Sequence, residues 1–97
     1  QLLHKHVSNA DKRGVPGKIV KYLAAQIDEK ELDKYARTNE DRTLIDFYIG
    51  CKHARFNEYA KARERFNRVV ENGDQKLDQY LLAVMELDAL STKGKVR

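Results

Sequence analysis

The sequence predicts an all-α domain built from antiparallel helical hairpins. Apolar residues recur at spacings of three and four along several stretches, which is the period of amphipathic helices. Only one proline and five glycines interrupt the 97 residues, and a β-rich domain of this size would need more turn residues. Charged residues make up 35% of the chain, which suits helices with solvated outer faces. These observations together indicate about five helices joined by short connections.

The pattern of apolar residues and helix-ending residues gives the expected bounds of each helix. The expected helices cover residues 16–27, 29–37, 43–55, 58–72 and 75–90. In the first, Ile19, Leu23 and Ile27 repeat at four-residue spacing and form one apolar stripe. Asp28 is expected to cap the second, with Glu31 as its capping-box partner. The polar stretch 38–42 is expected to be a loop.

Three further residues are expected to mark helix ends. Asn57 is a candidate cap for the fourth helix, and Asp74 is a candidate cap for the fifth. Gly73 is expected to end the fourth helix. The third helix carries an unusually wide apolar arc, so we expect it to have neighbours on two sides. Gly50 sits in the middle of this helix, where a glycine indicates that another helix backbone passes close.

The chain is interpreted as one helical domain with short flanking segments. Residues 1–14 are expected to be an N-terminal remnant and connector, residues 15–90 the helical domain, and residues 91–97 a flexible basic tail. Because the sequence begins at Gln1 rather than Met, we expect it to be a piece of a longer protein. No apolar run approaches the roughly 18 residues that a transmembrane helix requires.

Residues 43–74 resemble one tetratricopeptide repeat, a helix–turn–helix unit with a period of about 34 residues. The resemblance rests on a large apolar residue followed by glycine in the first helix, Ile49 and Gly50. In the second helix it rests on an aromatic, Tyr59, a small residue three positions later, Ala62, and a second aromatic, Phe66. The resemblance implies that Gly50 and Ala62 lie where the two helices cross, with the aromatic rings filling the seam.

The chain departs from this pattern at four places. Asp46 stands where the repeat has a tryptophan, and His53 stands where it has a later aromatic residue. Val69 stands where it has a small residue, and Asp74 stands where it has a closing proline. Over residues 18–90 the chain is also similar to the C-terminal part of bacterial NlpI-type tetratricopeptide lipoproteins, through segments 19–23, 46–50 and 79–83 in that order. That resemblance implies a scaffold that docks partner proteins and often dimerises. It also implies a periplasmic or membrane-anchored location, and without it the expected location is cytoplasmic.

The resemblance to tetratricopeptide repeats implies a groove lined by the first helix of each pair. The residues that would face this groove in the third helix are Leu44, Phe47, Cys51, Ala54 and Arg55. A competing interpretation buries some of them beneath the preceding hairpin, and the sequence leaves this choice open. The expected partner is another protein or a peptide.

Two other surfaces are candidates for interactions. Lys61, Arg65 and Arg68 follow one face of the fourth helix, either as a solvated surface or as a site for an acidic partner or nucleic acid. The net charge of +4 falls short of the dense basic stripe typical of nucleic-acid binders. Leu77, Leu81 and Met85 of the fifth helix are candidates for self-association as a homodimer.

No group of residues in the sequence predicts catalysis, a metal or a cofactor, and no small-molecule substrate is indicated. The single cysteine, Cys51, is next to Lys52 and His53, but neighbours one and two apart on a helix do not face one another. A buried thiol is therefore expected. His4 and His6 have metal-ligand spacing but lack a nearby third ligand. The sequence thus favours a binding protein over an enzyme.

Overall fold

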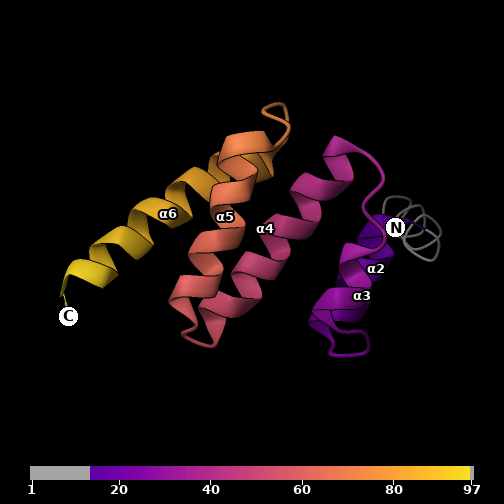
Figure 1. Cartoon of the computed structure of the whole chain (residues 1–97), viewed down its shortest axis with the longest axis horizontal. Coiled ribbons are helices and arrows are strands. Elements are labelled where there is room, and N and C mark those ends of the chain that lie inside the picture. The colour runs from indigo at the N-terminus through magenta and orange to yellow at the C-terminus, as the bar shows by residue number, and fades with distance from the viewer. Residues whose placement is uncertain (1–13, 97) are drawn as a thin grey trace, which may run out of the picture.

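The computed structural model describes residues 14–96, with side chains described through Thr92. All regular secondary structure in this part of the chain is α-helical, which confirms the predicted all-α class. Its helices are α2 (Val15–Leu23), α3 (Glu29–Asp33), α4 (Asn39–Arg55), α5 (Tyr59–Asn72) and α6 (Asp78–Val96). Figure 1 shows α4 and α5 as a central antiparallel pair, with the short helices α2 and α3 on one side and α6 on the other.

Helix α4 begins earlier than the sequence analysis expected. The segment 38–42, expected to be a loop, instead contains the N-terminus of this helix. Thr38 caps it, because its Oγ1 accepts a hydrogen bond of 3.0 Å from the backbone N–H of Asp41. A threonine followed three residues later by an acidic residue is a known helix start, so the signal was present in the sequence.

The expected caps are only partly right. Asp28 does cap α3, since its Oδ1 accepts from the backbone N–H of Glu31 at 2.8 Å. Asn57 does not cap α5: it adopts a left-handed conformation, with φ of 63°, immediately after α4 ends. Asp74 opens a turn, accepting from the backbone N–H of Lys76, and α6 begins only at Asp78. Helix α6 continues to Val96, so most of the expected basic tail is helical.

Helix α4 is buried on two sides, as its wide apolar arc predicted. On one side Ile45 and Ile49 pack against the short helices in a first apolar core. The residues of α2 and α3 in this core are Val15, Ile19, Tyr22 and Leu32. On the other side Phe47 packs into a second core with α5 and α6. The residues of α5 and α6 in this second core are Ala62, Phe66, Val69, Ala83 and Leu90.

The closest approach between α4 and α5 lies at Gly50. A Cβ atom at this position would stand only 2.8 Å from Cε1 of Phe66, whose ring is fully buried. Ala62 is also fully buried, and Tyr59 packs against the same core. A glycine therefore lies at the close approach of α4 to α5, with the Phe66 ring against it and Ala62 buried in the same core.

We predict that Gly50→Ala destabilises the protein although alanine is the better helix former. The gain in helix propensity is about 1 kcal/mol, whereas forcing a methyl group into a packed core costs roughly 1–3 kcal/mol. The expected net loss, about 1 kcal/mol, can be measured by urea unfolding. Combining Gly50→Ala with Phe66→Leu should make the alanine less costly than it is beside Phe66. A Gly50→Ala variant more stable than the wild type would contradict this packing.

Candidate functional site

An apolar groove lies between alternate helices of the structure. It forms a cavity of about 440 Å³ whose walls come from α2, α4 and α6. Its lining residues are Pro16, Ile19, Val20, Leu23, Leu44, Tyr48 and Gln79. Val20 is 57% exposed and Leu23 is 40% exposed, so the α2 wall presents large aliphatic side chains to solvent. Exposed apolar side chains around a concave surface are typical of protein-binding sites.

The groove has one polar end. Nε2 of Gln79 donates a hydrogen bond of 3.2 Å to the hydroxyl oxygen of Tyr48. This contact leaves the Gln79 side-chain carbonyl able to accept a hydrogen bond and the Tyr48 hydroxyl able to donate one. The pair can therefore bind a peptide group of an incoming main chain, while the remaining walls accept aliphatic side chains.

Only one of the five groove residues expected from the sequence lines this cavity, namely Leu44. Phe47 is 6% exposed, and its ring lies 5.7 Å from that of Phe66, so it belongs to the core. Cys51 and Ala54 are half-buried and pack against the same core. Arg55 is exposed at the end of α4, apart from the cavity. Phe47 is thus buried, but against α5 and α6 and not beneath the preceding hairpin as the competing interpretation had it.

The expected basic face of α5 is wrong at its central residue. Arg65 is only 6% exposed, and its guanidinium group binds three carboxylates. Nη1 donates to Oδ1 of Asp46 at 2.7 Å and to Oδ1 of Asp33 at 2.9 Å. Nη2 donates to Oδ2 of Asp33 at 2.8 Å and to Oε2 of Glu29 at 2.6 Å. Arginine is suited to this role because its planar fork matches a carboxylate with two parallel hydrogen bonds.

The other two residues of that face lie closer to solvent. Lys61 is exposed, and the Arg68 side chain is 43% exposed. Arg68 lies 3.4 Å from Glu64 and 3.7 Å from Asp46, so acidic residues of this chain already balance part of its charge. The face is therefore a mixed surface and not a basic stripe, which weakens the case for an acidic partner.

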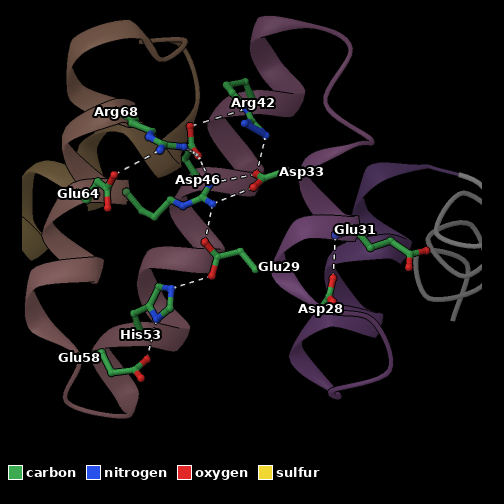
Figure 2. A network of polar contacts seen from close by, with 11 residues as sticks. Asp28, Glu29, Glu31, Asp33, Arg42, Asp46, His53, Glu58, Glu64 and Arg68 are labelled. Atoms are coloured by element: carbon green, nitrogen blue, oxygen red, sulfur yellow. Dashed lines mark hydrogen bonds and ion pairs between the residues drawn. The ribbon is translucent and has the colours of Figure 1, made fainter.

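Arg65 joins two helices whose backbones do not touch. Among the described residues, the backbones of α3 and α5 make no close contact with one another. Glu29 and Asp33 lie one turn apart on α3, and Asp46 lies on α4 between the two helices. Figure 2 shows the carboxylates of these three residues converging between the helices. The long side chain of Arg65 is therefore the direct link between α5 and α3.

Further charged residues extend this cluster along α4. Nη2 of Arg42 lies 2.9 Å from Oδ1 of Asp33. His53 lies between two carboxylates, with Nε2 at 2.9 Å from Glu29 and Nδ1 at 2.7 Å from Glu58 (Figure 2). A doubly protonated imidazole ring can donate to both carboxylates, whereas a neutral ring can donate to only one. We call the seven residues Glu29, Asp33, Arg42, Asp46, His53, Glu58 and Arg65 the charge cluster.

The surroundings of Asp33 and Asp46 in the cluster shift their pKa values in opposite directions. Burial would raise the pKa of Asp33, but the hydrogen bonds and charge of Arg65, with the charge of Arg42, outweigh burial and lower it. Asp46 is more deeply buried, and burial raises its pKa despite the hydrogen bond from Arg65. Burial would lower the pKa of Arg65, yet its hydrogen bonds to Asp33, Asp46 and Glu29 raise it. Arg65 therefore remains charged at every pH at which the protein is folded.

Cys51 has the properties of a packing residue. Burial, together with the nearby charge of Glu86, raises the pKa of its thiol to about 11. At neutral pH the thiol is therefore protonated, and a protonated thiol is a poor nucleophile. In the part of the chain that the structure describes, no three histidine, cysteine or acidic side chains are grouped to hold a metal ion. His4 and His6 lie outside the described residues.

Comparison of the chain with protein-family profiles, with curated protein sequences and with solved structures finds no match. Within residues 14–96, no helix combines the length and the apolar character that crossing a bilayer requires. Two of the departures from the tetratricopeptide pattern, Asp46 and His53, belong to the charge cluster, whereas Val69 and Asp74 do not. A polar residue at a position where a repeat has an aromatic one was thus the signal that could have indicated the cluster.

We predict that Asp33 and Asp46 affect the acid stability of the protein in opposite directions. Asp33 has a lowered pKa, so the unfolded chain takes up its proton first and the native state loses stability as pH falls below about 4. Asp46 has a raised pKa, so its protonation favours the native state as pH falls into the same region. Urea unfolding between pH 6 and about 3 should show a shallower pH dependence for Asp33→Asn and a steeper one for Asp46→Asn. Equal slopes in both variants and the wild type would contradict the cluster.

Proposed function

We propose that this chain is a non-enzymatic scaffold of the tetratricopeptide type that docks a partner protein or peptide in the groove between α2, α4 and α6. The observation that carries the proposal is the exposed aliphatic wall of the cavity, formed by Val20 and Leu23 opposite Leu44. The arrangement of the helices supports it, because α2, α4 and α6 line the cavity while α3 and α5 do not. In the repeats that the chain resembles, the first helix of each pair likewise lines the concave surface.

The chemistry of the groove indicates the kind of segment that would bind. The cavity is large enough for one or two aliphatic or aromatic side chains of a partner. Tyr48 and Gln79 would hold the main chain beside them through the hydrogen-bonding groups that remain open. The expected ligand is therefore a short segment with aliphatic anchors and an accessible peptide group.

A selected peptide provides the test of this proposal. Peptides selected from a displayed random library against the wild-type chain should be rich in aliphatic residues. The Gln79 side-chain amide signal should shift when such a synthetic peptide is added in an NMR titration. The variant Leu23→Lys should reduce peptide affinity at least tenfold, because it places a charge in an apolar wall.

The matched control for this test is Leu81→Lys, which alters an exposed leucine of α6 that does not line the cavity. This variant should bind the selected peptide as the wild type does. If Leu23→Lys also binds normally, or if Leu81→Lys alone loses binding, the groove is not the docking site.

A second candidate function is self-association through the outer face of α6. Leu81 and Met85 are 62% and 58% exposed, and Leu82 and Val84 are each 41% exposed on the same helix. The opposite face of α6 is already buried against α5, with Ala83 and Leu90 in the core. A helix with apolar residues on both faces is stabilised when a second element covers its outer side. Leu77, also expected at this surface, is only half-exposed.

Sedimentation equilibrium tests this second candidate. If the outer face of α6 mediates a dimer, the apparent mass of the wild-type chain should increase with concentration. Leu81→Glu with Met85→Glu should return the chain to a monomer, because a charge would replace each of two apolar side chains at the interface. A wild-type chain that remains monomeric at high concentration would remove this candidate and leave the groove proposal unaffected.

A further inference from the structure

One wall of the groove belongs to a part of the fold that is attached to the rest in few places. The short helices α2 and α3 form a hairpin, and residues 34–38 connect it to α4. This hairpin supplies more than half of the residues around the cavity, namely Pro16, Ile19, Val20 and Leu23. The position of the hairpin therefore sets how wide the groove is.

The contacts that hold the hairpin divide into apolar and charged sets. Val15, Ile19, Tyr22 and Leu32 of the hairpin form one apolar core with Ile45 and Ile49 of α4. This interface is less extensive than the one between α4 and α5. The hydrophobic effect itself is not directional, so an apolar interface of this small extent fixes the angle between packed helices less closely than oriented hydrogen bonds do.

The charged contacts fix the orientation of the hairpin relative to α4 and α5 more closely. Arg65 binds both Glu29 and Asp33 on α3, with two hydrogen bonds to Asp33 in a fork. Charge-assisted hydrogen bonds of this kind are short and depend strongly on orientation. Arg42 adds a second contact to Asp33, and His53 adds a second contact to Glu29.

One further polar contact fastens the hairpin at α2. Nζ of Lys52 donates to the backbone carbonyl of Tyr22 at 3.1 Å and lies 4.3 Å from the centre of the Tyr22 ring. This contact is made by α4 and not by α5, so it does not replace the link through Arg65. The backbones of α5 and of the hairpin make no close contact in the described residues.

We propose that Arg65 is a positioning residue for the groove. Its hydrogen bonds to Glu29 and Asp33 fix the position of the α2–α3 hairpin, which forms one wall of the groove and can otherwise move. When these hydrogen bonds break, the hairpin turns about residues 34–38 and the groove widens, while α4, α5 and α6 keep their arrangement. The inference rests on the proposed function only for its biological meaning, because the motion itself requires no partner. A partner that fits the narrower groove would then bind most tightly when Arg65 is hydrogen-bonded to both Glu29 and Asp33.

The decisive variant is Glu29→Gln with Asp33→Asn, which removes the two carboxylate charges of α3 that bind Arg65, together with their contacts to Arg42 and His53, and hardly changes side-chain size. It leaves the contact between Arg65 and Asp46 intact, so the pairing of α4 with α5 is preserved. The matched control is Glu31→Gln with Glu40→Gln, which removes one exposed carboxylate of α3 and one of α4, neither of which contacts Arg65. Net charge therefore changes equally in both double variants.

Groove width can be measured by pulsed electron paramagnetic resonance between spin labels in a Cys51→Ser background. One label pair, at Lys21 and Asp78, reports the distance from α2 to α6. A reference pair, at Lys61 and Asp78, reports the distance from α5 to α6. All of these label sites are exposed. In Glu29→Gln with Asp33→Asn, the α2–α6 distance should lengthen and its distribution should broaden, while the reference pair and the control variant remain unchanged.

Amide hydrogen exchange gives a second, label-free measurement. The amides of α2 and α3 should exchange about tenfold faster or more in Glu29→Gln with Asp33→Asn, because each lost charge-assisted hydrogen bond favours local opening. The amides of α4 and α5 should not change. If both distances and the exchange rates stay as in the wild type, packing alone positions the hairpin and the inference is wrong.

It is equally wrong if α4 and α5 open together with the hairpin, since Arg65 would then hold the whole fold and not one wall. If Glu29→Gln with Asp33→Asn does not fold, Asp33→Asn alone provides the same comparison with a smaller change. Neither result depends on peptide binding. A failure of this inference therefore does not contradict the groove proposal. A failure of the peptide test likewise does not contradict the inferred motion of the hairpin.

Discussion

The close approach of α4 to α5 at Gly50 is the constraint on which the rest of the structure depends. Gly50 lets the ring of Phe66 lie directly against the backbone of α4. Asp46 stands one turn before Gly50 on the same face of α4, and Arg65 immediately precedes Phe66 on α5. The contact that seats the aromatic ring therefore also brings the guanidinium group of Arg65 against the carboxylate of Asp46. A larger residue at position 50 would separate both pairs.

The burial of Arg65 explains why acidic residues of α3 must lie nearby. A buried guanidinium group is costly unless its hydrogen-bonding positions are filled by acceptors. Asp46 fills only part of them, and α3 supplies the remainder through Glu29 and Asp33. A buried ion pair often adds little net stability compared with apolar residues of the same shape, but removing one partner is severely destabilising. The cluster is therefore best understood as setting the orientation of α3, and with it the α2 wall of the groove.

The sequence predicted those features that depend on residues close together in the chain. The helical period, the Asp28 cap, and the pairing of small and aromatic residues between Gly50 and Phe66 are all visible in local patterns. The pairing of residues within the charge cluster could not be predicted in this way. Asp33 and Glu29 lie 32 and 36 residues from Arg65, so no spacing rule connects them. Arg65 therefore resembled an outward-facing residue, although it is buried in the folded chain.

The lining of the groove was also only partly predictable from the sequence. A wide apolar arc on α4 correctly indicated neighbours on two sides, but it could not show which part of the arc stays open. Phe47 was expected in the groove and is in the core, whereas Tyr48, its neighbour in sequence, lines the cavity. One position along a helix changes the direction of a side chain by about 100 degrees, so small differences in the crossing angle decide between the two.

The contact between Gly50 and Phe66 can be measured directly by two-dimensional proton NMR. If α4 and α5 approach as described, the two α protons of Gly50 should show strong nuclear Overhauser effects to the ring protons of Phe66. Their resonances should also be displaced by the ring current. If these protons show no such effects while the chain remains helical by circular dichroism, the two helices do not cross at Gly50, and the charge cluster and groove derived from that crossing would be incorrect.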